Sequence, residues 1–178
     1  MPMIRLHDKN FELYLTASSI AERVNSIATQ INTDFATKKP LFIAILNGSF
    51  MFAADLFKQV SIDAEICFIK MASYKGTKSS GQLVTAIGLD MEVFARHVLI
   101  VEDIVDTGNT LHEFLPQLQH QQPASLQVAA LLHKPEATIY PIQVRYIGFS
   151  IPSQFVVGYG LDYNGLGRNR PDIYRLSE

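Results

Sequence analysis

Three acidic side chains stand close together near the middle of the chain. Glu102 and Asp103 directly follow the apolar residues 98–101, and Asp106 comes three positions later. Carboxylates at this spacing would repel one another and any nearby anion unless something positive or rich in hydroxyls lay between them. A divalent cation is one such group, and a sugar is another. The acids therefore favour a site that binds a cation or a hydroxylated ligand.

The residues after the acids predict a phosphate-binding turn. They are Thr107, Gly108, Asn109 and Thr110, all small or polar, and they lead into an apolar spacing typical of a helix. A strand-to-helix turn of this kind presents free backbone N–H groups, hydroxyls and the positive end of the helix dipole, which suit a phosphate. A sugar phosphate bound together with a divalent cation would satisfy both the turn and the acids.

The apolar residues 98–101 predict the strand that positions the acids. Val, Leu, Ile and Val in succession are typical of a strand buried on both faces, in a parallel sheet covered by helices. The acids then lie at the carboxyl end of the strand, where open α/β sheets bind ligands. A Walker B strand has the same pattern, but residues 76–79 lack the Gly-Lys pair of a Walker A motif and no other match occurs. The solvated mouth of an ordinary α/β sheet is the remaining alternative.

Strands alternate with helices along the chain, which indicates an α/β fold with a doubly wound, mainly parallel sheet flanked by helices. Residues 16–35 carry the apolar stripe of an amphipathic helix, and Ser19 with Glu22 fits a capping box at its start. Further helices are predicted at residues 50–57 and from residue 111 onward, and strands at Leu41–Leu46, 65–70, Leu83–Ile87, 127–132 and 144–149. The 178 residues suffice for one domain, residues 1–178.

The composition excludes several classes of protein. A formal net charge of −2 argues against binding to nucleic acid, which requires a basic surface. No apolar run approaches the roughly 20 residues of a membrane span, and the first residues lack the features of a signal peptide, so we expect a cytoplasmic protein with no membrane partner. Cys67 lies in an apolar run and favours a buried structural role. Gly158 and Gly160 begin like a dinucleotide fingerprint, but no strand-helix-strand unit follows, so no nicotinamide or flavin cofactor is predicted.

The string EDIVDTGNTL, residues 102–111, resembles the phosphoribosyl pyrophosphate signature of the type I phosphoribosyltransferases. Five separate blocks between Leu41 and Arg168, in the same order, resemble the hypoxanthine-guanine phosphoribosyltransferases. The resemblance implies the type I phosphoribosyltransferase fold, with a small hood built from the N-terminal and C-terminal segments. It also implies purine salvage with Mg²⁺: ribose 5-phosphate passes from phosphoribosyl pyrophosphate to N9 of hypoxanthine or guanine, giving IMP or GMP and pyrophosphate. Members of this family form homodimers or homotetramers, and we expect the same here.

The resemblance assigns roles within the signature. Glu102 and Asp103 match the pair that holds the ribose hydroxyls and the metal, and Asp106 matches the general base at purine N7. The loop that binds the 5-phosphate is matched by Thr107, Gly108, Asn109 and Thr110.

Other blocks match the purine site and its surroundings. Lys134 matches the lysine that donates to purine O6, and Phe155 matches the ring that stacks on the base. Val156 matches a residue that contacts the base edge through its backbone, and Asp162 matches a residue of the purine site that is also a second metal ligand. Arg168 matches the arginine that binds pyrophosphate.

The pyrophosphate loop departs from the family pattern. Asn47, Gly48 and Ser49 match this loop, but a lysine or arginine commonly stands at the position of Asn47, so a contact here would use the backbone. We predict a cis peptide bond immediately before Asn47, as the family often has. Ser73 and Tyr74 match the start of a mobile loop, residues 73–82, whose polar sequence predicts a lid that excludes water.

Two kinds of alternative stay open. Another phosphoribosyltransferase, for adenine, orotate or xanthine, is the nearer one; Lys134 with Phe155 and Val156 favours a 6-oxopurine over the first two but separates xanthine poorly. The other is a non-enzymatic regulator on the same fold that binds phosphoribosyl pyrophosphate as a signal and nucleic acid as a target. Asp106 and the acidic charge balance argue against it.

Overall fold

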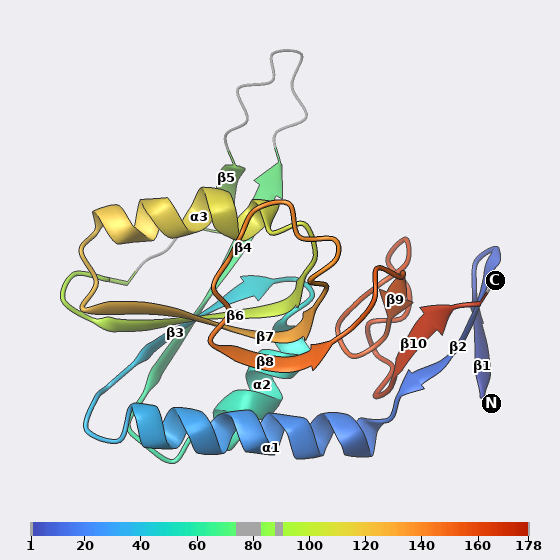
Figure 1. The fold of residues 1–178 in the computed structure, drawn as a ribbon, viewed down its shortest axis with the longest axis horizontal. Helices are drawn as coiled ribbons and strands as arrows, with labels where there is room; N and C mark the ends of the chain where they lie inside the picture. Colours follow the sequence, from blue (N-terminus) through green and yellow to red (C-terminus); the bar gives the residue numbers. More distant parts are fainter. Residues whose placement is uncertain (1, 74–82, 88–90, 178) are drawn as a thin grey trace, which may run out of the picture.

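A six-stranded sheet forms the centre of the protein (Figure 1), whose computed structural model describes residues 2–73, 83–87 and 91–177. Its strand order is β5-β4-β3-β6-β7-β8. The strands are β3 (Leu41–Leu46), β4 (Glu65–Ser73), β5 (Leu83–Ile87), β6 (His97–Val105), β7 (Ser125–His133) and β8 (Tyr146–Ser150). Only β5 runs antiparallel to its neighbour; the other five strands are parallel. The predicted mainly parallel α/β sheet is therefore confirmed.

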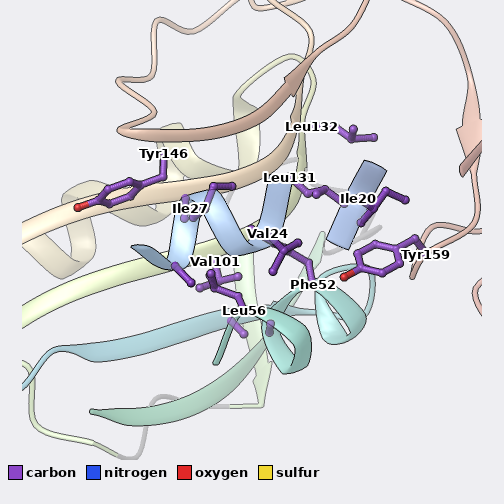
Figure 2. Packing of buried hydrophobic residues seen from close by; sticks show 14 of the residues in the cluster. Ile20, Val24, Ile27, Phe52, Leu56, Val101, Leu131, Leu132, Tyr146 and Tyr159 are labelled. Carbon is purple, nitrogen blue, oxygen red and sulfur yellow. The ribbon is translucent and has the colours of Figure 1, made fainter. Parts of the chain in front are cut away.

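Helices cover both faces of this sheet. Helices α1 (Ala17–Asp34) and α2 (Phe50–Lys58) pack on one face, and α3 (Asn109–His120) packs on the other. Leu99 and Val101 of β6 belong to the core cluster under α1 and α2, which Figure 2 shows around Val101. Val98 and Ile100 belong to the cluster under α3. Successive residues of β6 thus point to opposite faces, as in any strand.

A second, antiparallel sheet joins the two ends of the chain, in the order β1-β2-β10-β9. Its strands are β1 (Met3–Leu6), β2 (Lys9–Leu15), β9 (Val156–Val157) and β10 (Ile173–Leu176). The side chains of Leu6, Phe11, Val157 and Tyr174 form its own small core. None of these strands was predicted from the sequence. Strands β1, β9 and β10 have four residues or fewer, whereas β2 has seven, with apolar residues at alternate positions.

Two local expectations were wrong. Strand β6 continues to Val105, so Glu102 and Asp103 lie within the strand rather than after it. The N-cap of α1 is Thr16, not Ser19: the Thr16 hydroxyl accepts from the Ser19 N–H at 3.2 Å. Thr16 has the extended backbone that an N-cap requires, which leaves Ser19 inside the first turn and Glu22 without a capping role. No helix in the described part of the chain is long and apolar enough to cross a membrane.

Candidate active site

A cleft of about 260 Å³, lined by residues 102–111, lies where β6 ends and α3 begins. Gly108 is the N-cap of α3 and has a φ of +81°, which favours glycine. Because Gly108 has no side chain, no cap occupies the helix N-terminus from this position. The Thr107 hydroxyl accepts from the Asn109 N–H at 3.3 Å and orders the turn. The predicted phosphate loop, Thr107, Gly108, Asn109 and Thr110, therefore presents the positive end of a helix to the cleft.

Glu102 is a buried carboxylate without a hydrogen-bond partner on one oxygen. Its side chain lines the cleft, and within the described residues no donor reaches Oε2. Burial raises the pKa of Glu102 well above its ordinary value, and repulsion from Asp103 raises it further. An unpaired buried acceptor of this kind suits a cation or a ligand hydroxyl.

Asp103 lies in contact with the loop after β3, because it follows Glu102 in the strand and points the other way. A Cβ added to Gly48 would lie 1.6 Å from Asp103 Oδ2, so only glycine allows this contact. Burial raises the pKa of Asp103 to about 6, although backbone hydrogen bonds and the charge of Arg168 oppose the shift.

Contacts with Ile45 and with Gly160 hold the loop that matches the family's pyrophosphate loop, residues Asn47, Gly48 and Ser49. The Leu46–Asn47 peptide bond is cis, as predicted. Asn47 is exposed, whereas Ser49 is fully buried and its hydroxyl donates to the Ile45 carbonyl at 2.5 Å. The Gly48 carbonyl packs against Gly160, where an added Cβ would come within 2.0 Å. The hydroxyl of Ser49 is therefore already used.

Lys134 and Asp106, assigned separately to the purine, form an ion pair. Lys134 Nζ donates to Asp106 Oδ2 at 2.7 Å. The Lys134 side chain is 8% exposed and that of Asp106 is 47% exposed. Lys134 is therefore not a solvated loop end. Asp106 lines the cleft and is paired with the buried ammonium of Lys134.

Asp162 and Arg168 also pair with each other. Arg168 Nη2 lies 2.5 Å from Asp162 Oδ1, and Nη1 donates to the Gly160 carbonyl at 2.6 Å. The charges of both side chains act on Asp103, in opposite directions. Asp162 and Arg168 therefore lie near Asp103, and the contact of Arg168 with Gly160 brings the pair beside the loop of Gly48.

The three predicted metal ligands Glu102, Asp103 and Asp162 do not form one metal-binding cluster. Among the described residues, no group of three His, Cys, Asp or Glu side chains could hold an ion. Glu102 and Asp103 point to opposite faces of β6, and Asp162 is held by Arg168 and by the Gly165 N–H at 2.7 Å. The donors still fit Mg²⁺, which usually binds one or two carboxylates and completes its shell with substrate oxygens.

Phe155 directly precedes β9, and Val156 is the first residue of that strand. The ring of Phe155 is 45% exposed and meets the edge of Tyr163 at 5.8 Å, with Phe11 at 6.2 Å. Val156 is buried in β9. Phe155 is thus a supported ring with a free face. Ser73 ends β4, while Tyr74 and the rest of the expected lid lie outside the described residues.

Residues 138–140 touch the phosphate loop and were not predicted from the sequence. The N–H groups of Ile139 and Tyr140 donate to the Thr107 carbonyl, and the Thr138 hydroxyl donates to the carbonyl of Asp106. Nothing in the sequence of this connection, between β7 and β8, indicates such contacts.

Comparisons with known proteins agree with this geometry. A family model described as phosphoribosyl transferase domain matches residues 12–164. The hypoxanthine-guanine phosphoribosyltransferase of Streptococcus pneumoniae is 39% identical over 168 residues, 94% of this chain and 93% of that protein. The hypoxanthine-guanine-xanthine phosphoribosyltransferase of Tritrichomonas foetus is 37% identical over 160 residues, 89% of this chain and 87% of that protein. A crystal structure of a hypoxanthine phosphoribosyltransferase from Staphylococcus aureus superimposes with a TM-score of 0.88 at 38% identity, covering 93% of this chain and 91% of that one.

The parallel sheet, with the predicted phosphate loop after β6, defines a type I phosphoribosyltransferase fold. Because the family model matches most of its length, the chain belongs to the phosphoribosyl transferase domain family.

Replacing Gly48 with alanine should destabilise the protein, because the new Cβ would overlap the Asp103 carboxylate. Overpacking of this kind costs about 1–3 kcal/mol. Urea denaturation of Gly48→Ala beside the wild type measures the loss. An unchanged midpoint would show that the Asp103 carboxylate moves away at no cost.

Replacing Glu102 with glutamine should stabilise the metal-free protein by about 1–3 kcal/mol, since it removes a buried, unpaired charge. The native state resists ionisation of Glu102, so the wild type loses stability relative to the variant as pH rises above 4.5. The advantage of the variant should therefore grow from pH 4 to pH 7. Denaturation in chelator measures it, with the exposed Glu22→Gln as control; equal behaviour of the two variants would contradict the prediction.

Proposed function

We propose that this protein is a hypoxanthine-guanine phosphoribosyltransferase of purine salvage. It transfers ribose 5-phosphate from phosphoribosyl pyrophosphate to N9 of hypoxanthine or guanine, giving IMP or GMP and pyrophosphate. The pairing of Lys134 with Asp106 beside the phosphate-binding cleft is the observation that carries the proposal. The relatives named for hypoxanthine and guanine support the same substrates.

The Lys134–Asp106 pair can read a 6-oxopurine at two positions. An ammonium has three N–H donors, so Lys134 can keep its bond to Asp106 and offer another to purine O6. Asp106 then accepts or holds the N7 proton while N9 attacks the anomeric carbon. Adenine carries an amino group at this position and would turn a donor toward a donor, which leaves buried groups unpaired.

The remaining residues bind and orient the substrates. The 5-phosphate lies in the turn of Thr107, Gly108, Asn109 and Thr110, and the free face of Phe155 stacks on the purine. The backbone of Val156 contacts the base edge, and Asp162 borders the same site. Pyrophosphate meets Arg168 and the backbone of Asn47, Gly48 and Ser49. Ser73 and Tyr74 match the start of the family's water-excluding lid, of which residues 74–82 lie outside the described part of the chain.

Mg²⁺ is the metal that these acids would hold. Glu102 and Asp103, with the ribose and pyrophosphate oxygens, would share its coordination, and Asp162 would serve a second ion. When bound, Mg²⁺ neutralises the charge that develops on the leaving pyrophosphate. The unpaired Glu102 Oε2 supports this assignment.

The assembly and its compartment complete the proposal. Residues 1–178 act as one phosphoribosyltransferase domain with the β1-β2-β10-β9 sheet as its hood, and the protein works in the cytoplasm as a homodimer or homotetramer. Light scattering in solution would measure the assembly; a monomer at all concentrations would contradict this part.

Pyrophosphate release with Mg²⁺ and phosphoribosyl pyrophosphate tests the reaction, with hypoxanthine, guanine, xanthine, adenine or no base. We expect release with hypoxanthine and guanine, and at least about 10²-fold lower kcat/KM with adenine. For xanthine we predict no outcome, because the name of the Tritrichomonas foetus relative includes xanthine whereas that of the Streptococcus pneumoniae relative does not. Silence with every base, together with salt-sensitive binding to RNA or DNA, would favour a regulator.

Asp106→Asn should retain substrate binding and lose about 10²- to 10⁴-fold in kcat, the usual range for loss of a general base. Steady-state kinetics with hypoxanthine measures the change. Asp63→Asn is the control, since Asp63 is exposed and only loosely paired with Lys39. An unchanged kcat in Asp106→Asn would remove Asp106 from this role.

A further inference from the structure

A short segment of the connection between β7 and β8 lies along the phosphate loop; we call residues 138–140 the strap. The N–H groups of Ile139 and Tyr140 both donate to the Thr107 carbonyl, at 3.0 and 3.1 Å. The Tyr140 carbonyl approaches Gly108 so closely that a Cβ there would lie 2.7 Å away. The strap therefore fixes the backbone of the phosphate loop from the side.

The Thr138 hydroxyl lies between two carbonyls at the other end of the strap. Thr138 Oγ1 is 3.2 Å from the Asp106 carbonyl and 3.0 Å from that of Lys134. These carbonyls belong to the two residues whose side chains pair at 2.7 Å. A hydroxyl has one proton and serves one carbonyl at a time, but its position between them limits how far their backbones can separate.

The strap also contacts helix α3. The Tyr140 ring stacks on His112, with centroids 4.2 Å apart and planes at 13°. The His112 N–H donates to the Gly108 carbonyl at 2.8 Å. A shift of the strap would therefore displace the phosphate loop in two ways: through the hydrogen bonds to Thr107, and through His112 in the first turn of α3.

We propose that Thr138 is a positioning residue for the purine-reading pair. Its hydroxyl holds the backbones of Asp106 and Lys134 at the spacing their side chains need, without touching the substrate itself. The strap extends this control to the 5-phosphate loop, so that the purine and phosphate ends of the site keep a fixed separation. The inference rests on the proposed function, because it assigns Asp106 and Lys134 to the base.

Thr138→Val keeps the shape of the side chain and removes the hydroxyl, while Thr138→Ser keeps the hydroxyl. With Thr138→Val we expect KM for hypoxanthine to rise and kcat/KM to fall about three- to tenfold, the effect of one lost hydrogen bond. KM for phosphoribosyl pyrophosphate should change less than twofold, because the backbone bonds to Thr107 remain. Thr138→Ser should restore most of the loss.

Thr33→Val is the matched control. Thr33 also donates its hydroxyl to the carbonyl four residues earlier, at 3.0 Å, but it lies on the exposed face of α1. We expect wild-type kinetics from this variant. A loss equal to that of Thr138→Val, a proportional change for both substrates, or no recovery with serine would overturn the positioning role.

Hydrogen exchange separates this proposal from the proposed function. In Thr138→Val, amides of residues 134–140 and 106–110 should exchange faster, while those of α1 should not change. This readout does not need an active enzyme, so a wild type without activity would contradict the proposed function alone. Unchanged exchange in both segments would overturn the inference, whatever the activity.

Discussion

Adjacent side chains of β6 must point to opposite faces of the sheet, and the site is arranged around that constraint. Glu102 turns toward the cleft at the start of α3, while Asp103 turns toward the loop after β3. The end of β6 therefore contributes a side chain to each of two loops, the one before α3 and the one after β3. Because the two carboxylates leave the strand on opposite faces, an ion shared by both would need further oxygens from a substrate. A phosphorylated, hydroxyl-bearing substrate meets this requirement, and a bare ion does not.

The site holds its acids in surroundings that disfavour their charge. Glu102 is buried with an unpaired oxygen, and Asp103 is packed against Gly48. A bound cation would relieve both the burial and the repulsion between them. In the free state, burial of these two acids opposes their ionisation, a pattern often found at functional sites. Lys134 and Asp106 follow the opposite pattern, since they neutralise each other before any ligand arrives.

The sequence predicted the central sheet, for physical reasons that can be named. Strands β3 and β5 have the predicted bounds, because turn-forming or polar residues flank both apolar runs. The extension of β6 through Glu102 and Asp103 was missed, since acids have low strand propensity and only pairing with β7 holds them in the ladder. In the second sheet, β1, β9 and β10 were too short to give a periodic signal, whereas β2 carries an alternating pattern, at Phe11, Leu13 and Leu15, that does predict a strand.

Contacts between distant residues lay outside what sequence patterns can predict. Lys134 and Asp106 were each identified through the family resemblance, but they are 28 positions apart and nothing in the sequence indicated that they pair. The same holds for Thr138, whose importance comes from two carbonyls that the fold brings to it. At Asn47 the sequence alone showed that the lysine or arginine common at this position is absent. The structure adds the cis peptide bond before Asn47.

The hood has a consequence for how the chain is made. Strand β2 is synthesised long before β10, yet one of its edges pairs with that strand, Leu15 with Ile173. At about 5–20 residues per second, on the order of 10 s of synthesis separates the two strands. During that interval β2 presents an unpaired edge, the kind of surface that pairs with the wrong partner. In the finished chain both edges of β2 are paired, so the nascent chain is the more exposed to such mispairing.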